Sequence, residues 1–197
     1  RLRARRMSSG LTFLRDTAVV SLFYISSFCV TFEILMPVQN TLFRDFHSFA
    51  SLLFLPHGVK VLSAWLLGWR SVIALLPGVF AVFWWVAGNG VFAPSRLAAI
   101  AVAVIIPALA FDIAGRLGLR VTPRARLRPC WPCIMGMGVV ISVASSLLTN
   151  LALSSPPQDY IAYLIGDVFG LFFLMTLLMY LFRALRKRAA PGEPRQP

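Results

Sequence analysis

Charged residues are scarce in this sequence, and acidic ones above all. Only 13% of its 197 residues are charged, and 7 aspartates and glutamates stand against 19 lysines and arginines. Hydrophobic residues make up 58%, and the mean hydropathy is +0.78. That is more apolar surface than a soluble domain of this length can hide in one core. The composition therefore predicts an integral membrane protein.

Cysteine and histidine are also rare, with three and two copies. Cys29, Cys130 and Cys133 are too few and too unevenly placed for a disulfide scaffold. The sequence has no Ser/His/Asp order, paired-carboxylate signature, phosphate loop or His-x-x-x-His spacing. We therefore expect no enzymatic activity, no catalytic residue, no metal site and no cofactor.

Long apolar runs dominate what is present. A helix that crosses the hydrocarbon core of a bilayer needs about 20 mostly apolar residues. Six runs of suitable length lie between polar breaks, at approximately 17–36, 47–68, 71–88, 96–115, 133–153 and 160–182. The sequence thus predicts an all-α integral membrane protein, in which a bundle of about six transmembrane helices forms one domain. That domain, 17–182, lies between a basic N-terminal segment, 1–16, and a basic, proline-rich tail, 183–197.

The basic residues favour one orientation of these helices. With six spans, 16 of the 19 lysines and arginines fall on one side, in segments 1–16, 68–70, 116–132 and 183–197. Basic residues in short loops collect on the cytoplasmic side, so both termini are predicted to be cytoplasmic. A five-span arrangement would move one terminal cluster outside. Because the basic residues form short clusters and no amphipathic face, we expect no nucleic-acid partner.

The second apolar run contains residues that do not suit a simple spanning helix. Pro56 and Gly58 interrupt it, and His57 and Lys60 lie beside them. Proline removes a backbone donor, and irregular backbone at membrane depth is tolerated only where it faces protein or a wet cavity. We therefore expect the second helix to be broken at Pro56–Gly58, with a re-entrant segment over 41–70 as the alternative.

Three charged residues are predicted to lie inside the membrane rather than at the helix ends: Glu33, Lys60 and Asp167. A charge at the middle of a bilayer costs about 2.5–3.5 kcal/mol on insertion scales, so such side chains usually face a protein interior or water. We predict a polar ligand-binding pocket in the outer half of the bundle, formed by His57, Lys60 and Asp167, with Glu33 near its mouth. The alternative is a proline kink in which Lys60 and Asp167 form a buried ion pair that fixes helix register.

Two short motifs add to this picture. Gly166 and Gly170 have the small-xxx-small spacing that allows close helix packing, which would turn the enclosed Asp167 toward other helices. Cys130 and Cys133 form a Cys-x-x-Cys pair where a basic loop enters the fifth predicted helix. A redox-active pair is one interpretation, because a helix N-terminus favours thiolate, and two ordinary interfacial cysteines are the other.

Other positions have conventional interpretations. Asp112 precedes Arg116 by one helical turn, so the two are predicted to pair at the helix end. Trp84 and Trp85 fit an aromatic belt at the membrane interface, and contact with a bound ligand is the alternative.

The stretches FLPHGVKVLSAWLLGWRSVIALLPG and YLIGDVFGLFFLMTLLMYL resemble two segments of bacterial membrane-associated sensor domains, found at the N-termini of histidine kinases and cyclic-diguanylate enzymes. The corresponding positions are Pro56, Gly58, Gly68, Arg70, Gly166, Asp167 and Gly170. The resemblance covers about a quarter of the chain. The family generally has more helices and feeds a cytoplasmic output domain, and it often has a small residue where this chain has His57.

The resemblance implies a short, stand-alone sensory module of the bacterial inner membrane, which binds an unknown small molecule and signals to a separate membrane-protein partner. Two other functions fit the same sequence. One is the substrate-binding subunit of a vitamin or metal uptake transporter, and the other is an accessory subunit of a larger membrane complex.

Overall fold

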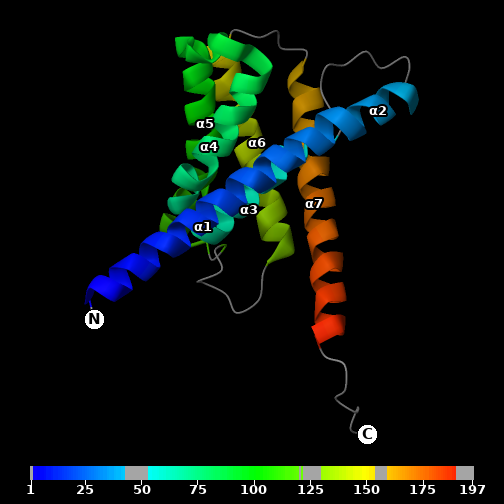
Figure 1. Cartoon of the computed structure of the whole chain (residues 1–197). Helices are drawn as coiled ribbons and strands as arrows, with labels where there is room; N and C mark the ends of the chain where they lie inside the picture. Colours follow the sequence, from blue (N-terminus) through cyan, green and yellow to red (C-terminus); the bar gives the residue numbers. More distant parts are fainter. Residues whose placement is uncertain (1, 43–52, 120, 122–129, 154–158, 190–197) are drawn as a thin grey trace, which may run out of the picture.

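The computed structural model describes residues 2–42, 53–119, 121, 130–153 and 159–189, and it is helical throughout these ranges apart from short turns (Figure 1). No strand occurs in them, which confirms the all-α prediction for this part of the chain. The elements are α1 (Leu2–Cys29), the π-helix η1 (Val30–Leu35), α2 (Met36–Leu42), α3 (Leu55–Leu67), α4 (Arg70–Ala87), the 3-10 helix η2 (Gly88–Phe92), α5 (Pro94–Arg116), α6 (Trp131–Leu153) and α7 (Asp159–Ala189).

Five segments are long and apolar enough to cross a membrane, so the chain is a multi-pass membrane protein. They are Gly10–Leu42, Arg70–Phe92, Pro94–Arg116, Trp131–Leu151 and Tyr163–Leu185. Helices α1 and α7 also extend into the basic segments predicted as termini, because arginine, lysine, leucine and alanine are good helix formers.

The remaining predicted span, 47–68, differs most from expectation. Residues 43–52 lie outside the described ranges, and the helix that follows them, α3, has only 13 residues. At 1.5 Å per residue it is about 20 Å long, which is shorter than the roughly 30 Å hydrocarbon core. The predicted break at Pro56–Gly58 is wrong, since α3 begins at Leu55 and continues through both residues.

Hydrogen bonds that the backbone at the start of α3 donates to two neighbouring helices explain why α3 can begin inside the bundle. Pro56 lies in the first turn, where its missing N–H would have no helical partner in any case. The N–H of Phe54 donates to the carbonyl of Gly166 on α7 at 2.9 Å, and the N–H of Leu55 donates to Thr31 Oγ1 at 3.3 Å. Unpaired backbone donors are costly away from water, so these bonds stabilise a helix start at this depth.

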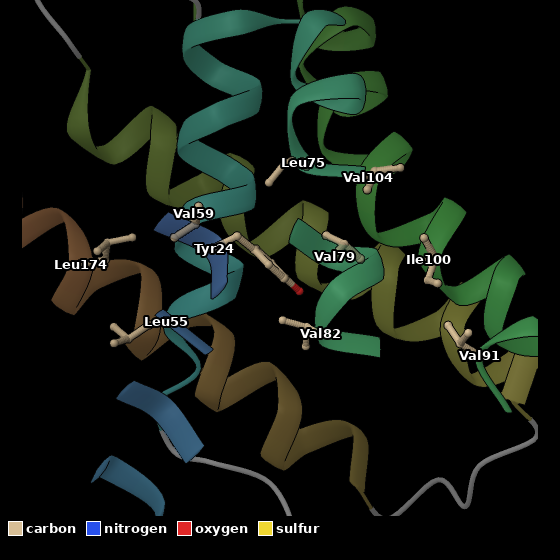
Figure 2. Close-up of a cluster of buried hydrophobic side chains, with 10 residues drawn as sticks. All are labelled: Tyr24, Leu55, Val59, Leu75, Val79, Val82, Val91, Ile100, Val104 and Leu174. Carbon is tan, nitrogen blue, oxygen red and sulfur yellow. The ribbon is translucent and has the colours of Figure 1, made fainter. Parts of the chain in front are cut away.

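Helix α3 is the centre of the molecule, and it contacts α1, α4, α5, α6 and α7. Its N-terminal half, with Leu55 and Val59, joins an apolar cluster with α1, α4, α5 and α7 (Figure 2). In this cluster Tyr24 of α1 extends from Val59 of α3 toward Val79 and Val82 of α4 (Figure 2). The residues of α3 are therefore positioned by the whole bundle rather than by one neighbour.

The helices alternate in direction. Helix α1 runs alongside α4 in the same sense, because the Arg70 guanidinium lies 5.1 Å from the Phe13 ring centre and Ser21 Oγ donates to the Ala74 carbonyl at 2.8 Å. Each later helix reverses the direction of its predecessor. As a result, the start of α1 and the end of α7 lie at the same end of the bundle (Figure 1).

Candidate functional site

A polar cluster joins α3, α6 and α7 inside the bundle. His57 Nδ1 lies 3.2 Å from Asp167 Oδ2, and Ser142 Oγ donates to the same carboxylate oxygen at 2.5 Å. The other ring nitrogen, His57 Nε2, lies 3.1 Å from the Gly138 carbonyl. His57 is 0% exposed and Asp167 8%. Two residues that are 110 positions apart thus meet as an acid–base pair in a desolvated interior.

The geometry around His57 fixes how protons are arranged. A carbonyl only accepts, so Nε2 carries a hydrogen that it donates to Gly138. Nδ1 therefore faces the Asp167 carboxylate, although it lies off the line of a good hydrogen bond and has no other partner among the described residues. A bare Nδ1 lone pair against an ionised carboxylate would be repulsive. A favourable contact between the two groups therefore needs a hydrogen between Nδ1 and the carboxylate oxygen.

Lys60 lies one turn further along α3, and it is only 8% exposed. Helical side chains lean toward the N-terminus, which brings its ammonium back to 5.9 Å from the centre of the Phe54 ring. In the part of the chain that the structure describes, Lys60 forms no ion pair. The direct Lys60–Asp167 ion pair of the alternative prediction is therefore not formed, since His57 contacts the carboxylate, although Asp167 still acts electrostatically on Lys60.

The contact with the Phe54 ring compensates only part of the free-energy cost of burying the Lys60 ammonium. Removing an ammonium from water costs several kcal/mol even after the protein relaxes. A desolvated cation–π contact stabilises the charge by about 2 kcal/mol. The Phe54 ring therefore does not offset the burial of this charge by itself, and the other attraction in the described part of the chain comes from the Asp167 carboxylate, which is not in direct contact with Lys60.

A cavity of about 730 Å³ opens next to this cluster, at the end of the bundle where η2 lies. We call it the aromatic cavity, because seven aromatic side chains line it: Tyr24, Phe28, Phe32, Phe54, Phe83, Trp85 and Tyr163. Two charged residues, Glu33 and Arg96, also line it. Its walls come from α1 and η1, from α4, from the first turn of α5 and from α7.

The predicted site residues thus divide into two groups. His57 and Asp167 come together, with Lys60 one turn away, and none of the three lines the aromatic cavity. Glu33 does line it, from the π-helical segment of the first span. Phe54 connects the groups, because its ring forms part of the cavity wall and also faces Lys60. The single pocket expected from the sequence is therefore a cavity with a charged cluster behind its wall.

Two glycines, Gly170 and Gly58, make this close arrangement possible. A Cβ atom on Gly170 would overlap the backbone of Phe54, and one on Gly58 would lie 2.8 Å from Leu174 Cδ2. Gly166 contributes the carbonyl that accepts the Phe54 N–H. The small-xxx-small motif therefore packs against the chain entering α3, and this contact sets Asp167 level with His57.

Sequence reasoning did not find Ser142, Gly138, Tyr24 or Phe54. Serine, glycine and aromatic residues are common in apolar helices, so they carry no signal comparable to a buried charge. Only the spacing of Ser142 from Gly138, one turn apart on α6, could have indicated a polar stripe.

The other end of the bundle has different features. Cys130 and Cys133 are joined in a disulfide at the start of α6, and the redox role remains a prediction. Arg116 Nε donates to Asp112 Oδ2 at 2.9 Å, as predicted. This pair borders a smaller crevice of about 360 Å³ beside Trp65 and Trp69.

No family model, no curated protein and no solved structure matches this chain. The resemblance to bacterial sensor domains therefore stays a prediction.

Proposed function

We propose that this chain is a ligand-binding sensory module of the bacterial inner membrane, which takes a small molecule into the aromatic cavity and passes the signal to a separate protein. The observation that supports this most is the position of the cavity directly beside a buried charged cluster. Its volume lies within the roughly 300–1,000 Å³ that is typical of small-molecule sites.

Helix α3 offers a route for the signal. Phe54, just before its first residue, borders the cavity, and its last residues, Ala64 to Leu67, border the crevice at the opposite end. A ligand that moves Phe54 would therefore act on an element that contacts five other helices. We propose that the partner binds at the crevice end, where the basic segments lie.

Co-purification in mild detergent tests the proposal. Mass spectrometry of the purified protein should reveal a bound small molecule that is neither lipid nor detergent. Trp85→Ala should release most of it, because this indole lines the aromatic cavity. Trp84→Ala is the matched control, since the neighbouring indole does not line the cavity. Equal retention by both variants, or no bound molecule, would contradict the proposal.

The identity of the protein partner separates this function from its alternatives. A sensory module should capture a kinase or cyclase, whereas the substrate-binding subunit of a transporter should co-purify with an energising membrane partner. An accessory subunit needs no cavity, so the volume beside Phe54 weighs against that function.

A further inference from the structure

Building on the proposed function, we propose that the ligand of the aromatic cavity is an amphipathic carboxylic acid with an aromatic body, and that Lys60 binds its carboxylate. Lys60 is buried and forms no direct ion pair in the described part of the chain, although the Asp167 carboxylate acts on its charge from a longer distance. Asp167, the nearest candidate, is already engaged by His57 and Ser142.

Lys60 is within reach of the cavity. Its ammonium lies 5.9 Å from the centre of the Phe54 ring, and that ring forms part of the cavity wall. The backbone of Phe54 is held by its bond to Gly166, so rotation of the side chain alone would open a path to Lys60. The positive end of the α3 dipole lies at the same place and favours an anion there.

The cavity wall suits an aromatic body. Phe28, Phe32, Trp85 and Tyr163 offer ring faces and edges, which pack well against another ring. Glu33 also lines the cavity and repels a carboxylate, so the acid group of such a ligand would point away from it. The aromatic wall and the repulsion by Glu33 together favour a monocarboxylate whose charged end points past Phe54 toward Lys60.

Arg96 is the competing anion site. Its guanidinium also lines the cavity, but it packs over the turn of η2, where a Cβ on Gly90 would overlap Nη1. Arg96 is partly exposed, so its charge is already solvated and gains less from pairing than the buried charge of Lys60. The two basic residues can therefore be distinguished by substitution.

The test uses three matched probes: 3-phenylpropanoate, its amide and 3-phenylpropylamine. Binding to the full chain in detergent is measured by ligand-observed NMR for the wild type, Lys60→Met, Lys60→Arg and Arg96→Gln. For the wild type and Arg96→Gln we expect the acid to bind about tenfold more tightly than the amide. Lys60→Met should remove that preference while keeping the side-chain volume, and Lys60→Arg should retain it.

The outcomes separate the two proposals. Equal binding of acid and amide to the wild type, or a preference that survives Lys60→Met, would overturn the role of Lys60. So would a preference that disappears in Arg96→Gln, or a failure of all three probes to bind. A co-purified molecule that depends on Trp85 would still support the proposed function in each of these cases. The proposed function would be refuted by the absence of a co-purified molecule, and the probe results do not decide it.

Discussion

Two buried serines on α6 differ in whether their hydroxyl groups have a hydrogen-bond partner. Ser142 and Ser145 are one turn apart and both buried, but Ser142 donates to the Asp167 carboxylate while Ser145 Oγ has no partner among the described residues. A hydrogen bond to a charged group is worth about 1.5–3 kcal/mol in soluble proteins and somewhat less between membrane helices.

We therefore expect Ser142→Ala to lower the free energy of unfolding by about 1–3 kcal/mol. Ser145→Ala should be neutral or slightly stabilising, because it removes an unpaired polar group. Reversible unfolding in mixed SDS micelles, followed by helicity, measures both. A similar loss in the two variants would show that the bond to Asp167 contributes nothing specific.

Two helical glycines provide a second comparison at the scale of single residues. A Cβ at Gly170 would overlap the backbone of Phe54, whereas one at Gly136 meets nothing within 4 Å. Gly170→Ala should therefore cost about 1–3 kcal/mol through overpacking. Gly136→Ala should gain up to about 1 kcal/mol through helix propensity. Opposite shifts in thermal unfolding are expected, and a stabilised Gly170→Ala variant would contradict the close approach of α3 and α7.

At the scale of elements, the start of α3 depends on a donor–acceptor pair with η1. Thr31 is 0% exposed, and its Oγ1 accepts the N–H of Leu55. Thr31→Val keeps the shape but leaves that N–H unpaired, so the first turn of α3 should open more often. We expect faster amide hydrogen exchange at Leu55 and Phe54. Thr176→Val is the control, because among the described residues its hydroxyl bonds within α7, to the Phe172 carbonyl, so exchange at the Leu55 and Phe54 amides should stay unchanged in this variant.

The elements differ in how far sequence could predict them. The predicted spans 96–115 and 133–153 lie within two residues of α5 and α6, because the length of an apolar run fixes the length of a helix that must cross lipid. The start of α3 is different. It is set by Thr31 and Gly166, which are distant in sequence, and no local pattern contains them.

The candidate site shows the same division. The cost of burying charge identified Asp167 and Lys60 from sequence, since apolar helices rarely tolerate such residues. Their partners could not be assigned in this way. The choice between His57 and Lys60 as the partner of Asp167 depends on the position of α3 along α7, because the two residues lie on the same face of α3, and the contacts of Gly166 and Gly170 with Phe54 fix that position.

At the scale of the whole molecule, the alternating helices and the distribution of charge agree. Arg70 begins α4, Arg116 ends α5 and Arg183 lies in the last turns of α7, so all three are at the end of the bundle where α1 begins. Arg96, in the first turn of α5, is at the opposite end. The positive-inside rule then predicts that the aromatic cavity faces the periplasm and the crevice faces the cytoplasm.

Single engineered cysteines test this orientation. In a background in which the native cysteines are replaced by serine, Asn89→Cys in η2 should react with a membrane-impermeant maleimide in intact spheroplasts. The native Leu117 side chain, just after α5, is 73% exposed. Leu117→Cys should react only after lysis, because this position lies at the opposite end of the bundle from Asn89. The reverse pattern would invert the orientation and place the cavity on the cytoplasmic side. Labelling of both positions from one side would contradict the crossing of the membrane by α5, because that single helix separates the two residues.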